Sequence, residues 1–327
     1  MAQLLDVSDE NIHDYWKLFV NRRAYILQTL HPDEDGEYRY YRPTDKVTGQ
    51  SLSLDESVVR RHLRGDVTFS LYTPNPKTQR SKWFVIDGDY KRALEHLCAL
   101  QYDLQYLYKI DAALEQSRRG AHLWIFCEVP LLAREGRQLL LRVAAKLQMP
   151  VKGAGQVEGL EIFPKQDEIT ASEFGNAIRG PLGVHRKVQT RYWFYGAERN
   201  LTDQLAYLKQ VREMTQAALV SVVDHLEPLP EPEKPKIVPI RRGPWYTGER
   251  QPFQILDHIT TPRKRAGRNW TTQCPSCALT GNDQSQNNLS IKIDEPTKYR
   301  CWAGCTKEMI REALGCPIPE SRVYAMR

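Results

Sequence analysis

The stretch WFVIDGD, residues 83–89, joins a strongly apolar run to two acids at its end. A short apolar run bounded by turn residues is typical of a buried β-strand. Side chains two positions apart on a strand point to the same face, so Asp87 and Asp89 form a converging anionic pair. Two carboxylates at the end of a core strand suit hard divalent cations, which take oxygen ligands. Because Asp-Gly-Asp is also common in turns, a solvated strand end is the alternative.

Short strands and helices alternate on both sides of this segment. The sequence predicts strands at 70–73, 82–86, 106–110, 122–129, 160–163 and 191–195, and helices at 9–28, 93–101, 134–147 and 203–215. Alternation of this kind indicates an α/β sandwich around a hydrophobic core. The predicted fold class is therefore α/β (α+β).

A histidine opens the apolar strand that follows the polar turn SRRG, residues 117–120. A polar side chain at such a position is unfavourable unless it faces a cleft or has a partner. Opposite metal-binding carboxylates, His122 is placed to bond a triphosphate oxygen, and Arg118 or Arg119 to add charge-assisted contacts. The alternative is a satisfied histidine at a strand edge, which is the commoner role of a lone histidine.

A third acid, Glu161, lies inside the apolar run LEIF, residues 160–163. An unpaired acid there is unfavourable, and either a metal or a cation such as Lys165 would resolve this. Farther along, residues 174–187 supply amide, guanidinium and ammonium groups around glycines. Such a segment suits contact with phosphates and a template backbone, although basic loops are usually solvated surface.

In this order the motifs resemble those of the archaeo-eukaryotic primase superfamily, above all the primase-polymerases of mobile elements and of conflict or CRISPR-associated systems. The segments that carry the likeness are GDVTFSLYTP, FVIDGDY, RGAHLWIF, EIFPKQD and GNAIRGPLGVHRK, within residues 65–195. The resemblance implies a catalytic core with an RRM-like sheet, in which Asp87, Asp89 and Glu161 hold catalytic Mg²⁺ or Mn²⁺. It also implies that His122 contacts the nucleotide's phosphates. The nucleotide- and template-binding residues that we expect are Arg118, Arg119, Lys165, Asn176, Arg179, Arg186 and Lys187.

The sequence departs from the pattern of that superfamily at two positions. The third acid is usually aspartate, but Glu161 occupies its place, so Asp167 remains a rival. The residue two before the histidine is often serine, but here it is Gly120. A hydroxyl contact to the nucleotide would then be replaced by a backbone contact.

Four cysteines are grouped near the C-terminus as Cys274-x2-Cys277 and Cys301-x3-Cys305. Two such pairs complete a tetrahedral S4 set, which favours Zn²⁺ in a closed, structural site. Residues 288–293 and 299–302 alternate like a hairpin, and a helix is predicted at 306–314. The pattern resembles the zinc ribbons of bacterial and plasmid primases, and this resemblance implies contact with single-stranded template or with the initiating nucleotide.

Proline and charge alternate in residues 225–239, which is typical of a semi-extended spacer. A basic stretch with interleaved tryptophan and tyrosine follows, within residues 241–270. We expect a catalytic domain at 1–225, a proline-rich and then basic linker at 226–262, and a zinc-ribbon module with a C-terminal helix at 263–327.

The 327 residues carry a net charge of +6, a mild bias towards polyanionic partners. No stretch approaches the roughly 20 apolar residues of a membrane-spanning helix, and no signal region opens the chain. We therefore expect a cytoplasmic protein without membrane contact, and clustered cysteines that bind metal before they form disulfides.

The leading functional hypothesis is a primase-polymerase that starts and extends chains on single-stranded DNA from nucleoside triphosphates, releasing pyrophosphate. A helicase or another replication or defence protein is a possible partner. One alternative is a non-catalytic protein that binds single strands through its basic and aromatic residues. The other is a metal-dependent nuclease, which also needs clustered acids but gives no role to the segments around His122 and Arg179.

Overall fold

A computed structural model describes residues 4–152, 158–171, 173–228, 253–279, 281, 283 and 285–318. The chain divides into two compact units, one drawn mainly from residues up to 230 and the other mainly from residues 231 onward. Part of the predicted linker, including Arg241, Arg242, Trp245 and Tyr246, lies outside the described residues.

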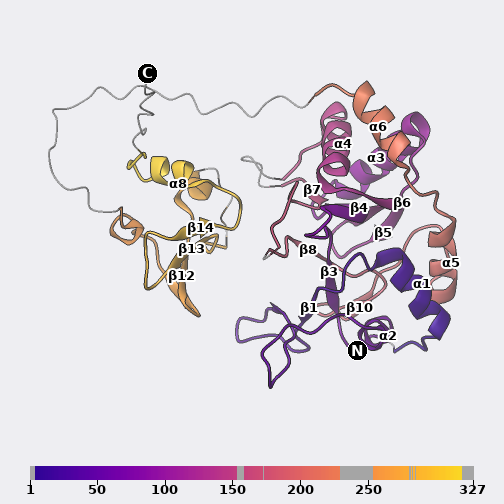
Figure 1. The fold of residues 1–327 in the computed structure, drawn as a ribbon, viewed down its shortest axis with the longest axis horizontal. Coiled ribbons are helices and arrows are strands. Elements are labelled where there is room, and N and C mark those ends of the chain that lie inside the picture. The colour runs from indigo at the N-terminus through magenta and orange to yellow at the C-terminus, as the bar shows by residue number, and fades with distance from the viewer. Residues whose placement is uncertain are drawn as a thin grey trace. The chain divides into compact units, whose positions relative to one another are not determined.

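The first unit combines helices with two four-stranded antiparallel sheets, which confirms the predicted α/β class (Figure 1). One sheet has the order β2-β1-β3-β8 and the other the order β5-β6-β4-β7. The strands are β1 Tyr25–Gln28, β2 Tyr40–Tyr41, β3 Phe69–Tyr72, β4 Arg80–Gly88, β5 Ala113–Gln116, β6 Ala121–Leu132, β7 Leu160–Phe163 and β8 Ala177–Arg179, with a short pair β9 Val184–His185 and β10 Thr190–Arg191. The helices are α1 Asp9–Phe19, α2 Glu56–Arg64, α3 Ala93–Tyr108, α4 Ala133–Lys146, α5 Leu201–Gln210 and α6 Gln216–His225.

The sheet that contains β4 has the topology β4-α3-β5-β6-α4-β7 with β4 and β6 at its centre. This is the split β-α-β arrangement of ferredoxin-like and RRM-like folds. The RRM-like sheet that the sequence resemblance implied is thus present.

The two faces of this sheet bury different side chains because successive strand residues point in opposite directions. Phe84 and Ile86 pack with residues of α3, α4 and α6 on one face. Trp83 and Val85 pack on the other face, with residues of α1 and of the first sheet. By the same alternation, Asp87 continues the row of Trp83 and Val85. It therefore lies on the face that meets the first sheet.

Several predicted elements are wrong in extent. The helix expected at 203–215 ends at Gln210, and of the strand expected at 191–195 only Arg191 belongs to a strand, β10. The helix expected at 9–28 ends at Phe19, because Val20 is extended and residues 25–28 pair with β3 as strand β1. The strand expected at 106–110 is instead the end of helix α3, which Lys109 terminates in the left-handed conformation. The true strand, β5, begins at Ala113, so the prediction placed the edge of the sheet several residues too early.

The second unit is a small four-stranded antiparallel sheet of order β11-β12-β13-β14. Its elements are η1 Ile255–Asp257, β11 Lys264–Ala266, β12 Asn269–Thr272, α7 Pro275–Leu279, β13 Leu289–Lys292, β14 Tyr299–Cys301 and α8 Lys307–Ala313. The predicted hairpin is confirmed, since Leu289 pairs with Cys301 and Ile291 with Tyr299. Ile255 and Ile259, from the segment assigned to the linker, are buried in this unit's core. Among the described residues, no helix has the length and apolar character needed to cross a membrane.

Candidate active site and metal centre

A row of four polar residues crosses the β5-β6-β4-β7 sheet at the end of strand β4. Strand register places Asp87 opposite His122 on one side and opposite Glu161 on the other. The same register places His122 opposite Glu115 of β5. Directly opposed residues of an antiparallel pair share a face of the sheet. The row Glu115–His122–Asp87–Glu161 therefore projects towards the first sheet.

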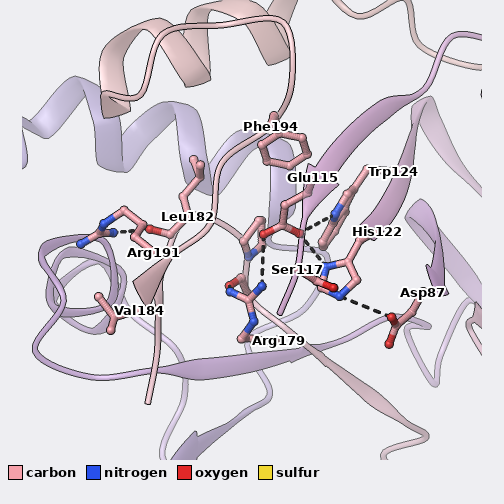
Figure 2. A network of polar contacts seen from close by, with 12 residues as sticks. Asp87, Glu115, Ser117, His122, Trp124, Arg179, Leu182, Val184, Arg191 and Phe194 are labelled. Carbon is pink, nitrogen blue, oxygen red and sulfur yellow. Dashed lines mark hydrogen bonds and ion pairs between the residues drawn. The ribbon is translucent and has the colours of Figure 1, made fainter. Parts of the chain in front are cut away.

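Glu115 is the centre of the hydrogen bonds around this row (Figure 2). Its Oε2 lies 2.7 Å from His122 Nδ1 and accepts a bond of 3.0 Å from Trp124 Nε1. Its Oε1 accepts a bond of 3.4 Å from the guanidinium of Arg179, which belongs to strand β8 of the other sheet. Because a carboxylate only accepts, Nδ1 of His122 carries the proton in this pair. His122 Nε2 then lies 3.5 Å from Asp87 Oδ1.

The charges of the row are coupled. Burial raises the pKa of Asp87, and the negative charges of Asp89 and Glu161 add to this, whereas His122 opposes it. Burial lowers the pKa of His122, but Asp87 and Glu115 outweigh burial, so the net pKa is raised. Burial raises the pKa of Glu115, but Arg179 and His122 outweigh it and leave the pKa below its usual value. The histidine is thus held between two acids.

The carboxylates nearest the pocket have cationic partners in the protein. Asp89 pairs with Arg119, across the end of the β5–β6 hairpin, and Glu161 pairs with Lys165. Asp87 Oδ1 is buried and has no hydrogen-bond partner among the described residues. A buried, unsatisfied carboxylate oxygen beside two further acids is a donor set that fits a hard divalent cation.

A pocket of about 240 Å³ opens at this row. It brings together six of the predicted residues: Asp87, Asp89, Arg118, Arg119, His122 and, from the other sheet, Arg179. The predicted residues Glu161 and Lys165 are not part of its lining. The rest of its lining was not predicted and consists of Tyr40, Ser117, Phe163, Ala177, Ile178 and His185. An acidic floor with arginines at its rim suits a cation-bound polyphosphate.

Other predicted binding residues lie outside the pocket lining. Arg186 is buried and donates to Thr68 Oγ1 and to the carbonyl of Gly65, both at 2.9 Å, so it joins segments of the fold. Lys187 pairs with Glu37 on the surface at 2.7 Å. Asn176 accepts a hydrogen bond from the side-chain amide of Gln166, three residues after the end of β7.

The rival third acid is also away from the row. Asp167 is about half exposed and pairs with Arg137 at 3.0 Å. Glu161 is one-fifth exposed and lies opposite Asp87 in the sheet. Strand register thus brings Glu161, and not Asp167, beside the aspartate pair.

The glycine found where serine was expected has a steric reason. A Cβ at Gly120 would lie 2.0 Å from the carbonyl oxygen of Gly88, so a larger residue cannot fit between the hairpin and the end of β4. The hydroxyl at the pocket comes instead from Ser117, whose Oγ accepts a bond of 3.2 Å from the Gly120 amide.

Sequence reasoning missed Glu115 because the strand that carries it was assigned several residues too early. A signal was present: with a four-residue turn at 117–120, Gln116 faces Ala121 and Glu115 faces His122. An acid opposite the conspicuous histidine was therefore readable from the hairpin alone.

In the second unit, Cys274, Cys277, Cys301 and Cys305 place all four Sγ atoms within 4.8 Å of one another. Within the described part of the chain this is the one group of three or more such ligands that is so tightly clustered. Burial, and then bonds with Cys305 and Cys301, raise the pKa of Cys277 to about 12. Four cysteines so close together can hold one metal ion with all-sulfur coordination when they give up their protons to it.

The sheet has the split β-α-β topology of RRM-like folds, and a row of three acids and a histidine crosses it. Residues 16–222 match the family model of the archaeo-eukaryotic primase domain of TOTE conflict systems, and the chain belongs to that family. The match spans the whole row, from β5 to β7, and does not extend to the four cysteines.

Two solved structures are similar to this chain at low identity. One is the catalytic domain of primase RepB′ in complex with initiator DNA, with 9% identity, a TM-score of 0.35 and coverage of 66% of this chain and 91% of that one. The other is the polymerase domain of Mycobacterium tuberculosis ligase D in complex with DNA, with 10% identity, a TM-score of 0.27 and coverage of 66% and 86%. No curated protein matches the sequence.

Proposed function

We propose that the first unit synthesises and extends primers on a single-stranded DNA template by two-metal nucleotidyl transfer. The observation that carries this is the row in which Asp87 stands between His122 and Glu161, together with the pocket that Asp87, Asp89 and His122 line with three arginines. When bound by the acids, Mg²⁺ or Mn²⁺ would supply activation of the attacking hydroxyl and neutralisation of the departing pyrophosphate.

The third acid of this proposed site is Glu161. It is held on a strand and projects from the same face as Asp87, which keeps its carboxylate fixed. Lys165 neutralises Glu161 in the structure, and Arg119 neutralises Asp89. Cation binding would exchange these side-chain partners for metal ions and free Arg119 and Lys165 to meet phosphate oxygens.

The remaining pocket residues bind and orient the nucleotide. His122 and Arg179 would donate to its phosphates. His122 would donate from Nε2 in its doubly protonated form, which Asp87 and Glu115 favour by raising its pKa, because Nδ1 already donates to Glu115. Arg118 at the pocket rim adds a fixed positive charge. Charge-assisted hydrogen bonds of this kind hold a triphosphate in line for attack by the primer hydroxyl.

The second unit would bind Zn²⁺ through its four cysteines and contact the single-stranded template. Strand register aligns Lys264, Thr271, Ser290 and Arg300 in one row across all four strands. The Arg300 guanidinium lies 5.3 Å from the ring centre of Trp302, whose side chain is 63% exposed. Cations interleaved with an exposed aromatic ring suit phosphate contact and base stacking.

The test is incubation of the full chain with unprimed single-stranded DNA, labelled ribo- or deoxyribonucleotides, and Mg²⁺ or Mn²⁺. The proposal expects labelled products that lengthen with time and that need both a template and a divalent cation. Products only on primed template would restrict the activity to extension.

Two outcomes would replace the proposal. DNA binding without any incorporation would favour a single-strand-binding protein, and shortening of the template would favour a nuclease. Both alternatives use features that the structure shares with the proposed enzyme, namely basic surfaces and clustered acids. Only nucleotide incorporation requires the His122 and Arg179 side of the pocket.

A further inference from the structure

Glu115 is a fully buried acid, 0% exposed, at the edge of the proposed nucleotide site. Three donors converge on its two oxygens: Trp124 and His122 on Oε2, and Arg179 on Oε1 (Figure 2). Glu115 itself does not line the pocket, whereas His122 and Arg179 do. A buried charge of this kind is tolerated only when its hydrogen-bonding capacity is satisfied by partners of opposite charge.

We propose that Glu115 is a positioning residue that fixes His122 and Arg179 for contact with the nucleotide's phosphates. This inference rests on the proposed function for the identity of the ligand. Glu115 touches neither the ligand nor the metal-binding acids. It acts only through the two pocket residues that it holds.

Its first action is on the imidazole of His122. By accepting from Nδ1, Glu115 fixes the proton on that nitrogen and the plane of the ring, so Nε2 faces the pocket near Asp87. A ring without this partner can turn over and exchange the roles of its two nitrogens. Carboxylate partners are known to orient histidines in this way when the other nitrogen meets a metal or a substrate.

Its second action joins the two sheets. Glu115 belongs to β5 of one sheet and Arg179 to β8 of the other, and the ion pair between them spans the sheets beside the pocket. Among the described residues, Glu115 is the acid with which Arg179 forms an ion pair. The other contacts of Arg179 are weaker: a bond of 3.5 Å to the Gly180 carbonyl and the Tyr192 ring at 5.8 Å.

An amide cannot replace this carboxylate. A glutamine at 115 has one accepting oxygen and one donating nitrogen. If the oxygen serves Trp124 and His122, the amide nitrogen points its protons at the guanidinium of Arg179, donor against donor. If the oxygen serves Arg179, His122 and Trp124 lose their acceptor. Either way, one of the two pocket residues is released.

The experiment compares Glu115→Gln with wild type in steady-state incorporation on primed template at saturating Mn²⁺. We expect KM for the nucleotide to rise about 10- to 100-fold, the effect of losing one charge-assisted hydrogen bond, with kcat within about threefold of wild type. A merely structural role would lower the amount of active enzyme, which reduces kcat and leaves KM unchanged. The matched control is Glu128→Gln, an exposed acid on neighbouring strand β6, which should behave as wild type.

A second readout does not depend on activity. Nitrogen-15 NMR of the full chain, with His122 assigned by its own substitution, should show a proton on Nδ1 with a strongly downfield resonance. The signal should persist in Glu115→Asp, which keeps the charge, and move upfield or vanish in Glu115→Gln, because a neutral amide is a weaker acceptor. If wild type incorporates no nucleotide, the proposed function fails, and this spectrum still decides the role of Glu115.

Glu115→Asp also covers the case in which the glutamine variant does not fold. It retains both acceptor oxygens but withdraws them by one methylene, so KM should rise about threefold or more with kcat unchanged. Two results would overturn the inference. The first is a KM equal to that of wild type in Glu115→Gln, or in Glu115→Asp if the glutamine variant does not fold. The second is a spectrum of the wild-type protein in which His122 carries no proton on Nδ1.

Discussion

The chain holds two sets of side chains suited to metal, and they are built in opposite ways. The four cysteines of the second unit lie in or beside short elements, Cys277 in α7 and Cys301 at the end of β14, and their Sγ atoms converge within 4.8 Å. The acids around Asp87 come from separate strands, and protein cations neutralise Asp89 and Glu161. The first set offers four sulfur ligands that could hold one metal ion. In the second set, Arg119 and Lys165 pair with two of the acids, whereas Asp87 Oδ1 is buried and has no hydrogen-bond partner among the described residues.

The difference between the two sets shows when sequence spacing alone is sufficient to predict a cluster of ligands. Two cysteines within one turn are necessarily close, so the spacing of residues 274–277 and 301–305 predicted the cluster directly. The row at Asp87 depends on strand register, which a single sequence does not contain. Its members are separated by as many as 74 positions, between Asp87 and Glu161, and they meet only because β4 lies between β6 and β7.

The largest expected effect concerns the cysteine cluster. Cys301→Ser should abolish stoichiometric zinc binding and unfold the second unit, because metal binding to such sites supplies about 10–16 kcal/mol of apparent folding free energy. Native mass spectrometry measures the zinc, and Cys98→Ser, an exposed thiol in the first unit, is the control. A serine variant with one zinc per chain and an unchanged second unit would refute the closed-site interpretation.

A smaller effect is expected from crowding the acid row. Gly120→Ser should force the hairpin away from the Gly88 carbonyl, destabilise the first unit by about 1–3 kcal/mol, and lower nucleotide incorporation. Gly49→Ser is the control, because a Cβ added at Gly49 would have no atom within 4 Å. This variant should be destabilised only by the roughly 1 kcal/mol that a non-glycine residue costs in the left-handed conformation. Urea unfolding measures both. Equal behaviour of the two variants would contradict the steric explanation for glycine at 120.

The smallest effect is the pH response of the other buried histidine of the first unit. His62 bonds the Pro181 carbonyl at 3.1 Å and accepts from the Phe69 amide at 3.2 Å, and burial lowers its pKa to about 3. Because the folded pKa is below the unfolded value, its contribution is complete above about pH 6.5 and is lost as pH falls towards 3. Between pH 6.5 and 5 wild type should lose about 2 kcal/mol more than His62→Gln. Parallel stability curves for the two proteins would show that His62 takes up no proton on unfolding.

Much of the fold was predictable because apolar runs and turns mark their own positions. The strands carrying Asp87, His122 and Glu161 were placed within a few residues, and family membership confirms the primase-like domain. The errors lie where local pattern is ambiguous. Tyr25–Gln28 continues a helical apolar stripe in the sequence but forms strand β1, which pairs with β3. The apolar residues 106–108 end helix α3 instead of forming a strand.

The site was predictable only in part. Residues named from motifs, such as Asp87 and His122, lie together in the pocket, whereas Arg186 and Lys187 bond other parts of the fold and its surface. A basic residue near a motif does not reveal whether its partner is a ligand or the protein's own carbonyl or acid. Glu115 was missed because its strand was assigned several residues too early, and its ion pair with Arg179 becomes visible only when the two sheets are assembled.

The central claim, that the row centred on Asp87 is a nucleotidyl-transfer site, is tested most directly by incorporation kinetics of Asp87→Asn at saturating Mn²⁺ and template. Because this change removes a metal-binding charge, worth several kcal/mol in the transition state, incorporation should fall about 1000-fold. DNA binding should persist. Asp103→Asn, which removes an acid paired with Lys146 beyond the site, should incorporate at the wild-type rate. An Asp87→Asn protein that incorporates nucleotides as fast as wild type would contradict the account.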